Sequence, residues 1–551
     1  MVHTVLRRAS RSAFMGLLFA AAAAAALAQT VSTAPAGPAS SGDAQADKIA
    51  ALEAEVKVLA AEIQDLKTQT VAQIKDVRDK EPKPPAASAV IASGKPAITS
   101  SDGKFTVNFH AVTQLDGADF RQMAAGPISS DLRRSGPALG SSASNVDLAH
   151  ARQLKTGDVV RRARIGADGT AFSDWDYRVV FDFGGPSNGV ENAGFLFEGW
   201  VQYSGLKPFK VRVGAFAPSL GLDDQASVNS MPFVERAAVS DLARNLVGGD
   251  SRTAAQIYAG DDRWLAAFAI AGRTVGSANS GAVVNIASTP ATAAIATAQS
   301  YGDQLGFTGR VAGTPIKGGD YLVHLGANAS YVSTPASVSG PAANGVTPIT
   351  SYTVALANTP ELRVDGTKLI NTGSIDAKHA STVGLELAAQ KQNLLLQSEY
   401  QHFTVNRSDI ASNPTFDGYY VSGTWVITGE RRTYNTQSGA FDAVPVAHPF
   451  DLKAGAWGAW ELGLRYSNVD LNYHAGAAGT APAIDAIRGG DEQNWTLGLN
   501  WYPNAISRVM LDYAQVKIDR ISPNAANYQT PTGAQIGQSY GVMSGRAQFA
   551  F

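Results

Sequence analysis

The chain has 551 residues, of which 45% are hydrophobic and 17% are charged, and its formal net charge is −2 at pH 7. Apart from one short apolar run at the N-terminus, no stretch reaches the roughly 18 apolar residues of a spanning helix, which excludes a helical membrane protein. The absence of cysteine excludes disulfides and cysteine-ligated zinc, and the balance of 45 basic and 47 acidic residues argues against a nucleic-acid partner.

Residues 1–28 have the features of a secretory signal peptide. Arg7, Arg8 and Arg11 precede an apolar run that ends at Ala28, and residues 26–28 fit an A-x-A cleavage site. A membrane-anchoring helix is the alternative, but the run is short and ends in small residues. We therefore expect the chain to leave the cytoplasm.

A helical segment is expected between two linkers. Residues 29–46 are rich in Ser, Ala, Pro and Gly and predict a flexible linker, and residues 81–100 predict a second, Pro-rich one. Residues 47–80 between them predict a coiled-coil helix, and β-branched residues at a with Leu at d favour parallel dimers. The core positions are Ile49, Leu52, Val56, Leu59, Ile63 and Leu66. A single amphipathic helix lying on the rest of the protein is the alternative.

Residues 101–551 alternate between apolar and polar side chains in many short segments. In residues 495–502, one face carries Trp495, Leu497, Leu499 and Trp501, while the other face is mostly polar. Period two with one apolar face indicates strands between an apolar medium and water, and aromatic residues at the ends of that face are typical of a transmembrane barrel. About sixteen segments show this pattern: 105–115, 159–170, 176–184, 195–204, 208–215, 253–260, 263–272, 304–313, 320–332, 382–390, 394–405, 417–428, 457–473, 493–502, 507–518 and 540–551.

The lengths of the connections support an all-β, antiparallel transmembrane barrel. Even-to-odd connections, such as 205–207 and 503–506, are short, whereas odd-to-even connections, such as 216–252, are long. Bacterial barrels have short periplasmic turns and long extracellular loops. One connection, 429–456, is long on the side of the short turns. An array of soluble β-sandwiches would alternate too, but it would not explain this asymmetry.

The last strand ends in an aromatic residue. Met543, Gly545, Ala547, Phe549 and Phe551 lie on one face of residues 539–551. A final strand that ends in Phe resembles the insertion signal of outer-membrane barrels.

Several stretches, in order along the barrel, resemble the phosphate-selective porin O/P family of Gram-negative outer membranes. They begin with RRARIGADGTAFSDWDYRVVFDFGG at Arg161 and LKPFKVRVGAFAPSLGL at Leu206, and continue with MPFVERA at Met231, GYYVSGTWVITGERRTYN at Gly418, GAWELGLRYSNVDL at Gly458 and TLGLNWYPN at Thr496. The resemblance implies a sixteen-stranded barrel, a homotrimer in the outer-membrane lipid bilayer, and small anions such as phosphate or polyphosphate as solutes. It also implies that the third extracellular loop, here residues 216–252, folds inward with Asp223, Asp224 and Arg236. A trimer differs from the dimer that the heptads favour, and we follow the resemblance because the heptad run is short.

Charged side chains on the lumen faces decide the solute in a porin, because selectivity comes from pore width and rings of charge. The alternation assigns eight cations to the lumen: Arg162, Arg164, Arg178, Lys210, Arg212, Arg310, Arg465 and Arg546. It assigns seven anions there as well: Asp168, Asp176, Asp182, Glu198, Glu386, Glu399 and Glu461. Clustered arginines from neighbouring strands would bind anions through bidentate hydrogen bonds. An equal alternative is that these arginines form ion pairs with nearby acidic residues and only stabilise the barrel wall.

We take Arg161, Arg162, Arg164, Arg178, Lys210 and Arg212 as the candidate anion-binding residues. By the resemblance, Arg161 and Arg162 match paired arginines that contact the anion, although strict alternation would point Arg161 outward unless the strand has a bulge. Two departures weaken the case for phosphate. Asp224 stands where such members carry Lys, and Val112 stands where they carry Arg.

The sequence predicts a porin rather than an enzyme, with no cofactor and no metal site. The eight histidines are not spaced as a metal pair, and no P-loop or Gly-x-Ser-x-Gly motif is present. The predicted function is passive diffusion of small hydrophilic solutes, chiefly anions, through an arginine-lined constriction. A non-selective general porin is the alternative, followed by a structural or adhesive barrel and an outer-membrane hydrolase.

Overall fold

The computed structural model describes residues 42–80, 87–92, 95–122, 154–185, 194–247, 251–275, 303–339, 350–410, 412–522 and 535–551. It also describes residues 249, 278–279, 283–288, 291–296, 300–301 and 533. The expected signal peptide, residues 1–28, and most of the linker 29–46 lie outside the described residues.

The chain divides into two compact units, residues 1–84 and residues 85–551. Helix α2 (Gly42–Lys80) belongs to the first unit and covers the expected helical segment. The side chains at its heptad positions, among them Leu52 and Leu59, are exposed in the single chain. Within the described residues, no helix combines the length and apolar character needed to cross a membrane.

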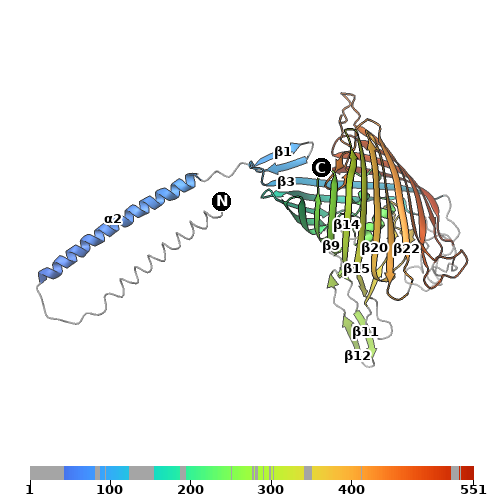
Figure 1. Cartoon of the computed structure of the whole chain (residues 1–551), viewed down its shortest axis with the longest axis horizontal. Helices are drawn as coiled ribbons and strands as arrows, with labels where there is room; N and C mark the ends of the chain where they lie inside the picture. The colour runs from blue at the N-terminus through green and yellow to red at the C-terminus, as the bar shows by residue number, and fades with distance from the viewer. Residues whose placement is uncertain are drawn as a thin grey trace. The chain divides into compact units, whose positions relative to one another are not determined.

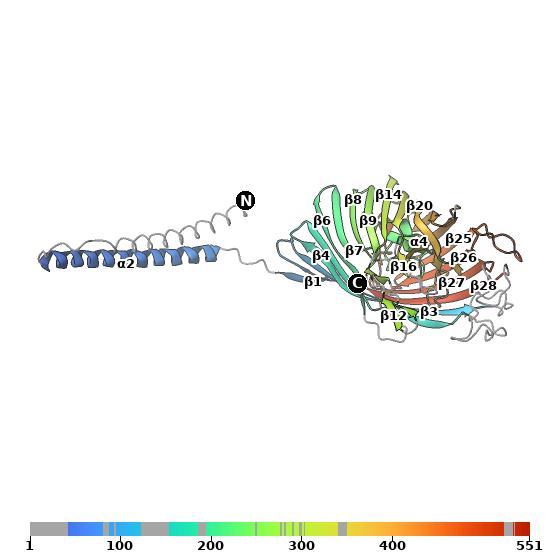
Figure 2. The ribbon, with the colours of Figure 1, turned by 90° about the horizontal axis from the view of Figure 1, so that it is seen from below.

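The second unit is built on a closed antiparallel β-barrel (Figures 1 and 2). In the described residues, sixteen strands pair in ring order, and β28 closes the ring on β3. They are β3 (Thr106–Arg121), β4 (Gly157–Ala171), β5 (Trp175–Asp182), β6 (Phe195–Leu206), β7 (Phe209–Phe216), β8 (Arg252–Gly260), β9 (Trp264–Thr274), β14 (Leu305–Lys317), β15 (Tyr321–Thr334), β20 (Ile375–Lys391), β21 (Leu394–Arg407), β22 (Thr415–Val426), β25 (Ala459–Tyr473), β26 (Ile487–Tyr502), β27 (Ser507–Asp519) and β28 (Ser539–Ala550). Each of the sixteen segments expected from the alternation overlaps one of these strands, so the predicted fold class is confirmed.

Period two along the strands separates an apolar outer face from a polar lumen. On β26, Trp495 and Leu497 are about half exposed on the outside, whereas Asn494 and Thr496 are buried inside. Exposed apolar side chains on the outer face are what lipid requires, and ring closure pairs the backbone groups that an open edge would leave bare.

The connections differ at the two ends of the barrel, as the sequence predicted. At one end, turns of two to four residues join β4 to β5, β6 to β7, β8 to β9, β14 to β15, β20 to β21 and β26 to β27. At the other end the connections are mostly longer. The exception is again the connection from β22 to β25, residues 427–458, which lies on the short-turn side.

Further short strands occur in addition to the sixteen strands of the barrel ring. Part of the expected linker 81–100 forms a hairpin of β1 (Ser88–Ala92) and β2 (Lys95–Thr99), and β2 pairs with the start of β3. The other short strands are β10 (Ala278–Asn279), β11 (Val283–Ser288), β12 (Ala291–Ala296), β13 (Ser300–Tyr301), β16 (Ser337–Ser339), β17 (Thr350–Val354), β18 (Ala357–Asn358), β19 (Ile370–Asn371), β23 (Tyr434–Asn435) and β24 (Ala440–Phe441).

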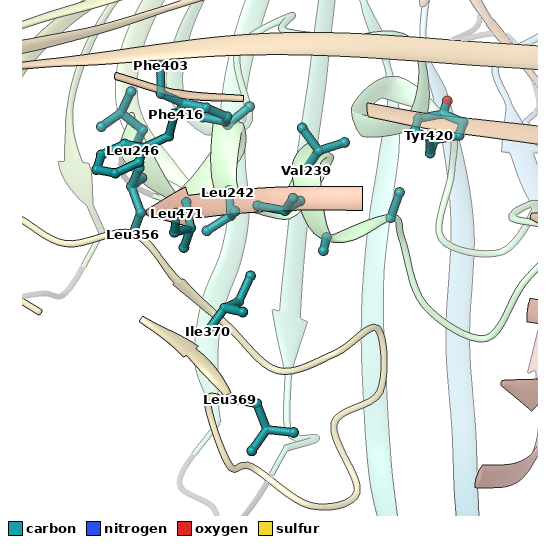
Figure 3. Packing of buried hydrophobic residues seen from close by; sticks show 14 of the residues in the cluster. Val239, Leu242, Leu246, Leu356, Leu369, Ile370, Phe403, Phe416, Tyr420 and Leu471 are labelled. Atoms are coloured by element: carbon teal, nitrogen blue, oxygen red, sulfur yellow. The ribbon is translucent and has the colours of Figure 1, made fainter. Parts of the chain in front are cut away.

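A hydrophobic core lies inside the barrel rather than around it. The connection from β7 to β8, residues 217–251, holds two short helices, α3 (Leu222–Gln225) and α4 (Ala238–Leu246). On α4, Val239, Leu242 and Leu246 pack against Phe403 of β21 and neighbouring wall residues (Figure 3). The same cluster includes side chains of the connection from β15 to β20, residues 335–374, among them Leu356 and Ile370. Apolar packing therefore fixes these two connections within the lumen.

Candidate functional site

The connection from β7 to β8 crosses the lumen. Side chains of the barrel wall hold it through hydrogen bonds to its backbone groups. The Glu399 carboxylate of β21 accepts hydrogen bonds from the backbone N–H groups of Leu222 (2.7 Å) and Asp223 (2.8 Å). The preceding Gly221 permits this close approach, because a Cβ there would lie 2.5 Å from Glu399 Oε1.

Further along the same connection, lumen side chains from other strands bind its backbone. Asp512 of β27 accepts from the N–H of Val234 at 2.8 Å, and Asn500 of β26 donates to the carbonyl of Pro232 at 2.8 Å. Because β21, β26 and β27, which are far from β7 and β8 in the ring order, all hold this segment, the connection has a defined path across the pore.

The connection from β22 to β25 enters the lumen from the short-turn end. Its Arg432 is buried and forms two hydrogen bonds with Glu461 of β25, at 2.6 and 2.7 Å. Arg310 of β14 donates to the carbonyls of Ser438 (2.6 Å) and Gly439 (2.8 Å) in this connection while it also pairs with Glu386. These contacts explain why the connection from β22 to β25 is long although it lies at the end of the barrel where the other connections are short.

The connection from β15 to β20 supplies a third set of charged groups. Glu361 pairs with Arg465 of β25 at 2.5 Å and accepts from Asn494 of β26 at 3.0 Å. Arg363 pairs with Asp241 of α4 at 2.7 Å. The lumen is thus narrowed by three connections, and Arg432, Glu361 and Arg363 of these connections pair with the wall or with another connection.

Arg161 faces the lumen because β4 has a bulge. The pairing of β3 with β4 shifts between Gln114 and Leu115, whose partners are Arg162 and Val160, so Arg161 is the extra residue. Val160 points outward and is 44% exposed, whereas the Arg162 side chain is 2% exposed. The bulge that an inward Arg161 requires is therefore present in β4.

Arg161 and Arg162 converge on Glu235 of the β7–β8 connection. Arg161 donates to Glu235 through Nε at 2.6 Å and Nη2 at 3.3 Å, and the Arg162 Nη2 lies 4.0 Å from the same carboxylate. Arg546 of β28 donates to Glu235 at 3.0 Å and also pairs with Asp116. Burial alone would raise the pKa of the Glu235 carboxyl, but the guanidinium groups of Arg161, Arg162 and Arg546 hold it well below its usual range.

The remaining candidate arginines line a separate cavity of about 1030 Å³. Arg164 pairs with Asp182 at 2.7 Å and lies over the ring of Phe197. Arg178 pairs with both Asp168 (3.3 Å) and Glu198 (2.5 Å). These pairs match the alternative in which wall arginines are braced by neighbouring acids.

Arg212 differs from its neighbours in this cavity. It donates two hydrogen bonds to the Gln202 amide oxygen, at 3.0 and 2.8 Å, and its guanidinium lies 4.0 Å from the centre of the Trp200 ring. Among the described residues, no carboxylate forms an ion pair with it. Lys210, next along β7, donates to Gln437 at 3.4 Å.

The three candidates of the β7–β8 connection stabilise the connection itself. Arg236 donates to the backbone carbonyls of Asp223, Asp224 and Ala226, at 2.9, 3.1 and 2.7 Å. Asp224 pairs with Arg244 at 2.5 Å, and the buried Asp223 carboxylate accepts from the N–H of Ala237 at 3.3 Å. Asp224, the acid that replaces a family lysine, is thus neutralised within its own connection.

The charge of the cavity is positive when its lining is taken as a whole. The basic lining residues are Lys95, Arg164, Arg178, Arg212, Arg236, Arg244 and Arg508. The acidic ones are Asp168, Glu198, Asp224 and Asp442, which leaves seven cations against four anions, a formal excess of three.

Comparison with known proteins decides the family. The model of the family described as "Phosphate-selective porin O and P" matches residues 139–551. The chain belongs to this family. Porin O of Pseudomonas aeruginosa is 26% identical over 374 residues, which cover 66% of this chain and 77% of that protein. An uncharacterized protein of Caulobacter vibrioides is 24% identical over 489 residues, covering 87% of this chain and 86% of that protein.

Solved porins are similar in fold at low sequence identity. An anion-selective porin from Comamonas acidovorans is 14% identical, with a TM-score of 0.40 over 81% of this chain and 100% of that one. OmpT of Vibrio cholerae is 11% identical, with a TM-score of 0.41 over 81% of this chain and 98% of that one. Family and barrel together indicate an outer-membrane porin, a channel rather than an enzyme.

Sequence reasoning missed three charged residues that shape the lumen of this porin. Glu235, Glu361 and Arg432 lie in connections, where no period assigns a side chain to a face. For Arg432 a signal existed, since its connection is long where short turns are expected. The sequence singles out Arg236 but not the adjacent Glu235. The partners of Glu235, Arg161 and Arg546, are 74 and 311 residues away from it in sequence.

Proposed function

We propose that this porin mediates passive diffusion of small hydrophilic anions, and that the arginine-rich cavity between the β7–β8 connection and strands β3–β7 favours them. The excess of three positive charges in its lining carries the proposal. In a narrow, low-dielectric passage, such an excess raises the local concentration of anions and lowers that of cations.

Arg212 is the side chain best suited to meet a passing anion. Its donors reach a neutral amide rather than a carboxylate, so its positive charge is not cancelled locally. The Trp200 ring against its face fixes the plane of the guanidinium without neutralising it. Arg164 and Arg178 contribute less, because each already has an acidic partner.

Phosphate as a dedicated solute has weaker support. The paired arginines that match the family's anion site, Arg161 and Arg162, lie against Glu235 rather than against the cavity. A general anion porin fits these contacts better than a phosphate-specific one. A non-selective porin remains the second candidate, favoured by the ion pairs of Arg178 with Asp168 and Glu198.

Export through the signal peptide 1–28 and assembly as a homotrimer complete the proposal. The family and the exposed heptad positions of α2 support self-association.

The experiment is single-channel recording of the purified porin in a planar bilayer, first in KCl and then with added phosphate. We expect conductance to close in three steps, with phosphate reducing the current only weakly. Half-block at micromolar phosphate would establish a phosphate-specific channel instead. Absence of any conductance would contradict the porin function.

A further inference from the structure

Three arginines in the lining of the large cavity lie against aromatic rings that line the same cavity. The pairs are Arg164 with Phe197, Arg212 with Trp200 and Arg508 with Tyr502, at 3.5, 4.0 and 4.8 Å between the guanidinium carbon and the ring centre. The pairs are built from β4, β6, β7, β26 and β27. The cavity therefore presents positive charge together with aromatic surface on separate parts of its wall.

Phe197 faces the cavity because β6 has a bulge. In the pairing of β5 with β6, Val180 lies opposite Glu198 and Phe181 lies opposite Leu196, so Phe197 is the extra residue. Without it, period two would place position 197 on the face opposite to Glu198, which is the outer face. The bulge thus brings a large apolar ring into a polar lumen, where contact with water is unfavourable unless an apolar group covers the ring.

The cavity has more apolar surface than these rings. Its lining also includes Phe109, Val112, Phe216, Val446, Ile506 and Phe551. A small hydrated inorganic anion gains nothing from such surface, whereas apolar surface with a few charged groups is typical of sites for organic ligands. The volume of about 1030 Å³ is also that of a site for an organic molecule, since such sites measure roughly 300–1,000 Å³.

Arg508 supplies a second guanidinium that, like Arg212, has no carboxylate in an ion pair with it among the described residues. Arg508 is buried and donates to the side-chain oxygen of Asn500 at 2.8 Å and to the carbonyl of Asn229 at 3.4 Å. Its Nε has no hydrogen-bond partner within the described part of the chain. An unsatisfied buried donor is costly, and a carboxylate in the cavity would supply the missing acceptor.

Stacked guanidinium groups suit one class of anion. The N–H donors lie in the guanidinium plane and bind a carboxylate there, while the two faces of the plane pack on aromatic rings. A ring on one face leaves the other face for a second ring. A planar aromatic carboxylate uses both the donors and the faces, whereas phosphate and sulfate use the donors alone.

We propose that this cavity binds aromatic carboxylates, which are planar organic anions, and that Phe197 and Trp200 make it specific for them. Arg212 and Arg508 bind the carboxylate group, and the ring of the solute packs against the stacked arginines and the aromatic lining. The inference rests on the proposed passage of anions and names the class of anion. If the rings only held the arginines in place, a planar ring would bind no better than a saturated one.

The test compares benzoate with cyclohexanecarboxylate, which carries the same charge on a saturated ring of similar size. Each anion is added to the full-length porin in a planar bilayer, and the concentration that halves the chloride current is measured. We expect benzoate to reach half-block at a concentration about three- to tenfold lower. Burial of apolar area alone would not favour benzoate. Because the comparison uses the wild type, it does not depend on the folding of a variant.

The double variant Phe197→Leu/Trp200→Leu assigns the difference to the two rings. Leucine keeps an apolar side chain at both positions but has no aromatic face, so the two anions should then block to the same extent. The matched control is Phe181→Leu/Trp175→Leu, which changes the same two residue types on β5, where both side chains are exposed on the outer face. This control should keep the stronger block by benzoate.

The outcomes separate this inference from the proposed function. If benzoate and cyclohexanecarboxylate block the wild type equally, or if the double variant keeps the stronger block by benzoate, the aromatic site does not exist, even in a channel that prefers chloride to potassium. If benzoate blocks more strongly and the double variant loses this difference, but the wild type does not prefer chloride to potassium, the aromatic site stands and the proposed general preference for anions falls.

Discussion

The guanidinium of Arg432 pairs with the carboxylate of Glu461, and the same guanidinium donates to the carbonyl oxygen of Ser230 at 2.7 Å. Ser230 lies in the β7–β8 connection, Arg432 in the β22–β25 connection and Glu461 on the wall strand β25. One buried side chain thus joins two of the three inward connections to the barrel. Because Arg432 holds the two connections together, we expect the narrowing of the pore to depend on this junction.

Removing this junction should loosen the pore. Arg432→Met leaves Glu461 buried without its charged partner, which costs about 3–5 kcal/mol of unfolding free energy. We expect a lower midpoint in denaturant and a higher, noisier single-channel conductance. The control is Arg431→Met, whose side chain donates to Gln390 and to the carbonyl of Gly319 rather than to a carboxylate. Equal effects from the two variants would show that the pair with Glu461 is not the cause.

Two neighbouring arginines of β4 should behave differently when neutralised. Arg164→Gln removes a charge that lines the cavity, so anion preference should fall while assembly persists. Arg162→Gln removes a buried charge held by Gln114 and close to Glu235, so thermal stability should fall more than selectivity. Reversal potentials and unfolding midpoints of both variants check this. If Arg162→Gln lowered anion preference more than Arg164→Gln did, the selective charge would lie at Arg162.

The fold could be predicted because every strand has its own period-two signal. Trp495 and Leu497 alternate with Asn494 and Thr496, and sixteen such segments with unequal connections leave a barrel as the consistent solution. The bulge at Arg161 could only be stated as a condition, since register depends on the partner strand β3 and not on β4 alone.

The candidate site was predicted less completely. Arg164, Arg178 and Arg212 were assigned to the lumen, and the structure places all three around one cavity. Glu235 and Arg432 could not be assigned in this way. Their positions follow from long-range contacts of aperiodic connections, such as the hydrogen bond between Arg546 and Glu235, which no local pattern encodes.

The N-terminal helix offers a test of self-association, because the chain has no native cysteine. Leu59 occupies a core position of the heptads on α2 and is 51% exposed in the single chain. Oxidation of Leu59→Cys should cross-link subunits into a band of twice the subunit mass on a non-reducing gel. Ala61→Cys, on the opposite side of the helix, should cross-link far less. Similar cross-linking of the two variants would contradict a coiled coil in this register.

The central claim is that positive charge in the cavity of β3–β7 selects anions. The most direct measurement is the zero-current potential across a planar bilayer under a KCl gradient, for the wild type and for Arg178→Gln/Arg212→Gln. The double variant reduces the formal excess of three charges in the lining to one. We predict that the sign of the wild-type potential will show a higher permeability for chloride than for potassium. In the variant, the potential should shift towards zero or towards the value expected for a potassium-permeable channel. An unchanged potential in the variant, or a potassium-side potential in the wild type, would contradict the claim.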